Sequence, residues 1–195
     1  NMARLAGASV LVSSGTLLAA IATGQVGVTG GALFYLASSI LAIGALFLLI
    51  ELLERGREVG AEVLAVSREA FGEGGEEDPE EQEEVGVTIP ATTAVLGMSF
   101  MGCALGLAGL PPLSGFLGKF AMLAPLFAPG AGGVSAVAGL LLGAFVLSGL
   151  VTVLAMTRLG IDLFWASAAP SVRVRVIEIG PVLLLLSLCV ALAVR

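Results

Sequence analysis

The residue best suited to chemistry in this sequence is Lys119, the only lysine in the chain. It lies in the stretch LAGLPPLSGFLGKFAML, where apolar residues surround it and two prolines precede it. A charged lysine at the centre of a bilayer costs about 2.5 to 3.5 kcal/mol on insertion scales, so such residues usually face a bundle interior and mark an ion pathway. Desolvation favours the neutral amine, and a nearby carboxylate favours the ammonium. A change in the surroundings of the lysine can therefore make it bind or release a proton. We predict that Lys119 carries protons.

Two adjacent prolines predict a break in the helix that would otherwise contain Lys119. Proline lacks an amide hydrogen, and it pushes the residue before it out of helical geometry. We expect one helix to end near Gly109 and a second to resume with Pro111 or Pro112 in its first turn, followed by Gly115. Backbone that leaves the helix at membrane depth must be buried in protein or line a wet cavity. These four residues are the candidate helix-break residues, and we expect water to reach Lys119 there.

The charge of Lys119 needs a partner that the neighbouring sequence does not supply. No acidic residue lies between Glu84 and Asp162. We expect the counter-charge to come from a part of the protein outside this chain, from another subunit or from water. The alternative interpretation is that Lys119 reaches the membrane surface and only anchors its helix. Its nearby aromatic residues are all phenylalanines, whereas interfacial anchors usually accompany Trp, Tyr or further basic residues.

Hydroxyl side chains inside the apolar segments are the other candidates for a proton path. We favour Ser38, Ser39 and Ser114, which would act by holding water. The alternative is that transmembrane hydroxyls bond a carbonyl one turn back or fill a helix contact. We expect that role for the others, which are Ser9, Ser13, Ser14, Thr16, Ser99, Ser148 and Thr152. Gly139 and Gly143 form a small-xxx-small pair that predicts close helix packing.

The composition indicates that all of these residues belong to a membrane protein. Hydrophobic residues make up 57% of the chain and charged residues 12%, and the mean hydropathy is +1.06. These values lie far outside the range of soluble domains. The chain has no histidine, and Cys103 and Cys189 both lie inside apolar segments. We therefore expect no metal site, disulfide or cofactor, and no nucleic-acid partner.

Apolar runs long enough to cross about 30 Å of hydrocarbon predict an all-α transmembrane bundle of about five crossings, one of them discontinuous. The expected order is two helices in 1–50, an acidic loop in 51–88, the broken helix in 89–128, a helix in 129–157, a loop in 158–175 and a final helix in 176–195. With the broken tract counted as one crossing, Arg4 and both charged loops fall on one side, which the positive-inside rule makes cytoplasmic. Arg195 alone falls on the other side.

The acidic loop contains a dense run of negative charge. Residues 69–84 hold nine of the fifteen acidic residues and no basic residue. Such density with Gly and Pro is typical of a self-repelling, disordered linker, and we favour that interpretation. The alternative is a cation antenna or a docking tail.

Several of these segments resemble one protein family. GLPPLSGFLGKF closely resembles the signature of the antiporter-like membrane subunits shared by respiratory complex I and the multi-subunit (Mrp-type) monovalent cation/proton antiporters. GALFYLASSILAIGALFLLIELLERG resembles the helix before it in that family. EEVGVTIPATTAVLG, AMTRLGIDLFW and RVRVIEIGPVLLLLSLCVALAV are similar to the D subunits of the Mrp-type antiporters in particular. The resemblance covers essentially the whole chain.

The resemblance implies a fold and roles for particular residues. Such subunits contain two inverted repeats, each with one discontinuous helix, and this chain would match the second repeat without its first helix, plus the final helix. Lys119 would be the proton-pathway lysine, and Pro111 and Pro112 would form the break. Relatives commonly have a histidine near the position of Ser38, so in this chain serine-held water would have to replace it.

The expected function is that of a non-enzymatic transporter subunit in the bacterial inner membrane. It would move protons in exchange for Na⁺ or K⁺ beside the other antiporter subunits. One alternative is an antiporter-like proton-pumping subunit of NADH-quinone oxidoreductase, which neighbouring open reading frames would distinguish. Another is a structural bundle with an inert lysine.

Overall fold

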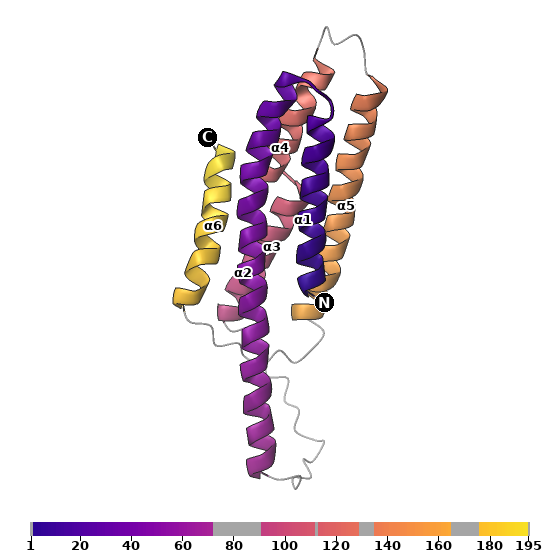
Figure 1. The fold of residues 1–195 in the computed structure, drawn as a ribbon. Helices are drawn as coiled ribbons and strands as arrows, with labels where there is room; N and C mark the ends of the chain where they lie inside the picture. The colour runs from indigo at the N-terminus through magenta and orange to yellow at the C-terminus, as the bar shows by residue number, and fades with distance from the viewer. Residues whose placement is uncertain (1, 72–90, 112, 129–134, 165–175, 195) are drawn as a thin grey trace.

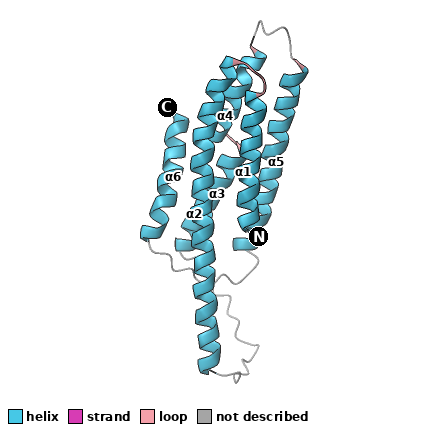
Figure 2. Ribbon diagram, viewed as in Figure 1, coloured by secondary structure: helices cyan, strands magenta, loops and turns pink. Residues whose placement is uncertain are grey.

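The computed structural model describes residues 2–71, 91–111, 113–128, 135–164 and 176–194, and these ranges form an elongated helical bundle (Figure 1). Figure 2 shows only helices and loops within them. The helices are α1 (Met2–Ile21), α2 (Val26–Phe71), α3 (Ala91–Ala108), α4 (Ser114–Leu123), the short 3₁₀ helix η1 (Ala124–Phe127), α5 (Ala136–Phe164) and α6 (Val176–Val194). The predicted all-α bundle with one discontinuous helix, now α3 and α4, is confirmed.

The described helices include three that are long and apolar enough to cross a membrane by themselves. These are Met2–Ile21, Val26–Gly56 and Ala136–Phe164. Shorter apolar helices cover Thr92–Ala108, Ser114–Phe127 and Glu178–Val194. The two ends of the chain lie at opposite ends of the bundle (Figure 1). This arrangement of the ends agrees with an odd number of crossings. The several apolar helices give the chain the architecture of a multi-pass membrane protein.

Two helices continue beyond the boundaries that hydropathy predicts. α2 extends past residue 50 to Phe71 and protrudes from the bundle (Figure 1), and α5 extends past residue 157 to Phe164. Charge ends the apolar run without ending the helix, because Glu and Arg are good helix formers. Arg55 and Glu51 form a salt bridge at 2.8 Å one turn apart on α2. Residues 69–71 of the predicted linker are therefore helical, and residues 72–84 lie outside the described residues.

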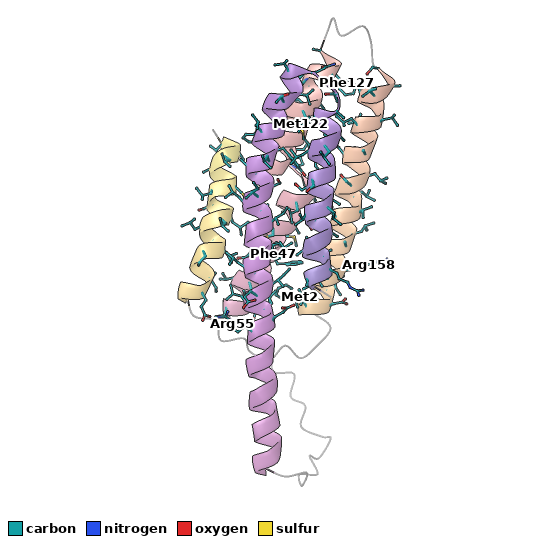
Figure 3. All side chains as sticks on the ribbon, viewed as in Figure 1. Met2, Phe47, Arg55, Met122, Phe127 and Arg158 are labelled. Atoms are coloured by element: carbon teal, nitrogen blue, oxygen red, sulfur yellow. The ribbon has the colours of Figure 1, made fainter. Side chains whose placement is uncertain are left out.

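The arginines whose side chains are described lie at one end of the bundle. Figure 3 shows Arg55 of α2 and Arg158 of α5 near Met2, and Phe127 at the opposite end. This placement agrees with the predicted grouping of the charged loops on one side. The assignment of that side to the cytoplasm stays a prediction.

The buried apolar residues form two clusters. The first joins α1, α2, α3, α5 and α6 and contains Met2, Leu46, Leu49, Leu96, Phe100, Cys103, Met156 and Val182 among others. The second joins α1, α2, α4, η1 and α5 and contains Ala20, Val28, Tyr35, Met122, Leu126 and Phe145 among others. Because α3 belongs to the first cluster and α4 to the second, the break between them is held by packing on both sides.

α2 and α4 approach closely because glycines lie at their contact. A Cβ atom on Gly31 of α2 would lie 2.6 Å from the carbonyl carbon of Ala121. A Cβ atom on Gly118 of α4 would lie 2.9 Å from the Cα of Tyr35. Any larger residue would force the helices apart. The long α2 therefore fixes the position of the short helix that carries Lys119.

Candidate functional site

The first half of the broken helix ends where the sequence predicts, at Ala108. Gly109 follows with φ 73°, in the left-handed region that glycine adopts without steric cost. The amide of Leu110 donates to the carbonyl of Leu105 at 3.2 Å, and the amide of Gly109 donates to that of Gly106 at 3.3 Å. This pair of bonds is the Schellman motif, which satisfies carbonyls of the last turn. The carbonyl of Ala108 remains available to another donor.

The second half begins later than predicted. α4 starts at Ser114 after an extended Leu113 (φ −82°, ψ 160°), so the expectation that a proline occupies its first turn is wrong. Leu110 and Pro111 each precede a proline and are thereby disfavoured from helical geometry. The amide of Leu113 instead donates to the carbonyl of Leu110 at 3.2 Å, which closes a turn. Pro111 lies in this turn, and Pro112 lies outside the described residues.

Gly115 brings the two half-helices into contact. It lies in the first turn of α4, and a Cβ atom there would collide with the carbonyl oxygen of Gly106 on α3. Only glycine leaves room for this approach. The C-terminal end of α3 and the N-terminal end of α4 therefore lie against each other at the break.

Lys119 points back into the break. Its side chain is buried, with 7% of its surface exposed, and its Nζ donates a hydrogen bond to the carbonyl oxygen of Ala108 at 3.2 Å. Long side chains on a helix lean toward its N-terminus, which here is the break. The last carbonyls of a helix have no partner within it and carry the negative end of the helix dipole. The amine thus lies where α3 favours a positive charge.

Glycines border this amine on two sides. A Cβ atom on Gly109 would lie 3.1 Å from the Nζ of Lys119. A Cβ atom on Gly149 of α5 would lie 2.8 Å from the oxygen of Ala108 and 3.9 Å from the Nζ. An ammonium has three hydrogens to donate. Within the described residues Ala108 is the one acceptor and no salt bridge reaches Lys119, so the other two hydrogens require water or groups outside them.

The structure brings together two of the three predicted serines. Ser38 of α2 and Ser114 of α4 lie with their hydroxyl oxygens 2.7 Å apart, and they are 2% and 1% exposed. The thiol of Cys189 on α6 approaches the carbonyl of Ser38 at 4.0 Å. Ser39 is not part of this pair, because its hydroxyl donates to the carbonyl of Leu36 at 3.0 Å. Three helices therefore meet at a buried hydroxyl pair at the start of α4.

The serine pair and the amine are separate groups on α4. Ser114 and Lys119 are five residues apart, which is about 7.5 Å along the axis at 1.5 Å per residue and about 140° around it. No hydrogen bond links Lys119 to either serine in the described part of the chain. A proton passing between them would need intervening water.

Most other hydroxyls in the helices bond a carbonyl of their own helix, as expected. Examples are Ser9 to Leu5, Ser14 to Val10, Thr16 to Val12, Ser148 to Phe145 and Thr152 to Ser148, at 2.7 to 3.0 Å. Ser99 differs, because its buried hydroxyl has no partner among the described residues. Ser13 is also buried, with 6% of its surface exposed.

Three residues near the site escape sequence reasoning. Tyr35 is the only tyrosine in the chain, and a buried tyrosine usually finds a polar partner, so it could have been singled out. Gly118 and Gly149 are two of 27 glycines, and only their contacts across helices distinguish them.

Comparison with known proteins agrees with the resemblance found in the motifs. No protein-family model and no solved structure matches the chain. The whole chain is 56% identical, over 199 aligned residues, to part of a Rhizobium meliloti (strain 1021) protein that is named as the D subunit of a probable K(+)/H(+) antiporter. The chain is therefore homologous to part of that protein. It covers 36% of the relative's length, so it spans about a third of that protein.

Proposed function

We propose that this chain is part of a proton-translocating subunit of a multi-subunit monovalent cation/proton antiporter, a secondary transporter in the bacterial inner membrane. Its similarity over its whole length to a protein named as the D subunit of a K⁺/H⁺ antiporter supports this proposal and favours it over a subunit of a redox enzyme. The structural observation that carries it is the position of Lys119, buried at the break with its Nζ on the carbonyl of Ala108.

In the proposed mechanism, the surroundings of the break stabilise both protonation states of Lys119. The carbonyl of Ala108 and the negative end of the α3 dipole stabilise the ammonium. The surrounding apolar clusters stabilise the neutral amine, because burial disfavours the charged form. A charged group that moves toward Lys119 or away from it can then shift the equilibrium between the ammonium and the neutral amine. Water at the break gives a proton to the lone pair of the neutral Nζ, and the ammonium later returns a proton to water on the other side.

Ser38 and Ser114 act beside this lysine in the proposed mechanism. A hydroxyl both donates and accepts, so the pair can pass a proton along or hold the water that does so. Its place at the start of α4 connects α2 to the break. The participation of Ser39 stays a prediction, since its hydroxyl proton already has an acceptor.

The proposal requires partners beyond this chain. The counter-charge of Lys119 would come from the rest of the subunit or from a neighbouring subunit of the antiporter, packed beside it in the bilayer. Segments 51–88 and 158–175, which include the ends of α2 and α5, would face the cytoplasm, in keeping with the shared end of Arg55 and Arg158 (Figure 3).

The test is ion exchange by the complete antiporter in everted membrane vesicles. Lys119→Ala should abolish proton movement driven by added K⁺ or Na⁺, because alanine cannot bind a proton. Ser14→Ala is the matched control, since this exposed hydroxyl bonds only the carbonyl of Val10, and it should exchange at the wild-type rate. Full exchange by Lys119→Ala, at equal amounts of assembled complex, would overturn the proposal.

A further inference from the structure

The two prolines leave two carbonyl oxygens at the end of α3 without a backbone donor. In a continuing helix, the donors to Leu107 and Ala108 would be the amides four residues later. Those positions are Pro111 and Pro112, which have no amide hydrogen. None of the backbone hydrogen bonds described at the break ends on either carbonyl. Helix carbonyls point toward the C-terminal end, so both oxygens face the break with free lone pairs.

The oxygen of Ala108 is the hydrogen-bond acceptor of the Lys119 amine. The Nζ donates to it at 3.2 Å, and Ala108 is buried, with 4% of its surface exposed. The last carbonyls of a helix carry the negative end of its dipole, so they favour a cation. A metal cation binds the lone pairs of a carbonyl oxygen as an ammonium does, by attraction to its partial negative charge. The end of α3 therefore has the electrostatics of a cation site, and the lysine occupies it.

Glycines keep other side chains away from this oxygen. A Cβ atom on Gly149 of α5 would lie 2.8 Å from the oxygen of Ala108 and 3.9 Å from the Nζ of Lys119. A Cβ atom on Gly109 would lie 3.1 Å from the same Nζ. Neither glycine has a side chain that would cover the oxygen after the lysine withdraws. A small ion can then take the place of the amine.

The ligands at the end of α3 suit a monovalent metal cation. Carbonyl oxygens are uncharged, and potassium channels use rings of them to replace the water around the ion. In transporters with broken helices, the C-terminal ends of half-helices also coordinate Na⁺. Ca²⁺ and Mg²⁺ usually bind carboxylates, and no metal-binding group of histidine, cysteine or acidic side chains occurs among the described residues. The chemistry therefore favours Na⁺ or K⁺.

We propose that the carbonyl oxygens of Leu107 and Ala108 form a binding site that Na⁺ or K⁺ and the ammonium of Lys119 occupy in turn. The site rests on the proposed function of Lys119. Two positive charges repel strongly at short range away from bulk water, so the site holds one at a time. When Lys119 releases its proton to water, the neutral amine withdraws and a partly hydrated cation takes its place. When water returns a proton to the Nζ, the ammonium displaces the cation. One proton is thereby exchanged for one cation.

The decisive measurement is the number of cations that the purified complete antiporter binds, by isothermal titration with KCl or NaCl at constant ionic strength. The two variants to compare are Lys119→Arg and Lys119→Ala. Arginine keeps a fixed positive charge that can reach the oxygen of Ala108, whereas alanine leaves that oxygen without a donor. Cation sites elsewhere in the antiporter are the same in both variants. The proposal predicts that Lys119→Ala binds one cation more per complex than Lys119→Arg, and equal numbers would overturn it.

A second pair of variants tests the oxygen itself, and it decides the question if Lys119→Arg does not assemble. In the Lys119→Ala background, Gly149→Ala places a methyl group against the oxygen of Ala108. The affinity for the additional cation should fall by about tenfold. Gly143→Ala in the same background is the control, because nothing lies within 4 Å of a Cβ atom there, and it should leave the affinity unchanged. Unchanged affinity with Gly149→Ala as well would overturn the site.

The cation site and the proposed proton transfer by Lys119 fail in different ways. Loss of exchange in Lys119→Ala, together with equal numbers of bound cations in Lys119→Ala and Lys119→Arg, would overturn the cation site and leave the role of Lys119 intact. Full exchange in Lys119→Ala would instead overturn the proposed function itself.

Discussion

Lys119 and Ala108 join the two halves of a broken helix through one hydrogen bond, from the Nζ of the lysine to the carbonyl oxygen of the alanine at 3.2 Å. The donor lies in α4 and the acceptor is the last residue of α3. The charge on the lysine is thereby coupled to the end of α3, whose carbonyls favour a cation. Changing either the geometry of the break or the charge of the lysine should alter transport.

Gly109→Ala should damage the site more than its backbone strain alone would. Alanine at φ 73° costs about 1 to 2 kcal/mol. A Cβ atom there would also lie 3.0 Å from the Cδ and 3.1 Å from the Nζ of Lys119. We expect lower thermal stability and slower cation-driven proton exchange, measured on the purified complex and in vesicles.

Gly24→Ala provides the control for strain. Gly24 has φ 66°, and nothing lies within 4 Å of a Cβ atom built on it. The Gly24→Ala variant should lose about as much thermal stability as Gly109→Ala and should exchange ions at the wild-type rate. Equal rates in the two variants would show that the contact between Gly109 and Lys119 has no part in transport.

Gly149→Ala should displace the acceptor of Lys119. Its Cβ atom would lie 2.8 Å from the oxygen of Ala108, which is closer than van der Waals contact, so α5 or the carbonyl must move. We expect exchange to slow by about tenfold, because a shift of the acceptor by a few tenths of an ångström weakens the only described bond of the amine. Vesicle assays at matched expression measure this effect.

Gly143→Ala is the matched control on the same helix. Nothing lies within 4 Å of a Cβ atom on Gly143 or Gly139, so the expectation that these two glycines pack against a helix is wrong for the described residues. Gly143→Ala should exchange at the wild-type rate. A loss as large as that of Gly149→Ala would point to a general effect of α5 rather than to the acceptor.

Ser38 and Ser114 should be coupled energetically. Removing one hydroxyl leaves the other buried and unpaired, which costs about 1 to 3 kcal/mol, whereas removing both removes the penalty. Ser38→Ala and Ser114→Ala should each lower the thermal stability, and the double variant should lose less than the sum of the two. Additive losses would show that the 2.7 Å contact contributes nothing to stability.

The sequence predicts the helices and the break because both follow from local chemistry. Apolar length gives the spans, and the two prolines with Gly109 end α3 at Ala108. The ends of α2 and α5 lie beyond the predicted ends, and this difference also has a local cause. Hydropathy marks where apolar surface ends, but Glu51 and Arg55 continue the helix of α2 with a salt bridge.

The partners of the site residues could not be predicted, because they are set by tertiary contacts. The acceptor of Lys119 is a backbone carbonyl, and every residue has one, so no residue type marks it. Ser38 and Ser114 are 76 residues apart, and only the packing of α2 on α4 pairs them and leaves Ser39 out. Gly118 and Gly149 are important because a side chain at either position would collide with a neighbouring helix, and only the structure shows those neighbours.

The most direct test of the central claim is the rate of cation-driven proton exchange by Lys119→Arg in the complete antiporter. Arginine keeps the positive charge and the donors that can reach the carbonyl of Ala108, but it does not give up its proton near neutral pH. If Lys119 works by binding and releasing a proton, the assembled variant should exchange no faster than Lys119→Ala. Exchange near the wild-type rate would contradict the account, because a fixed charge would then be sufficient.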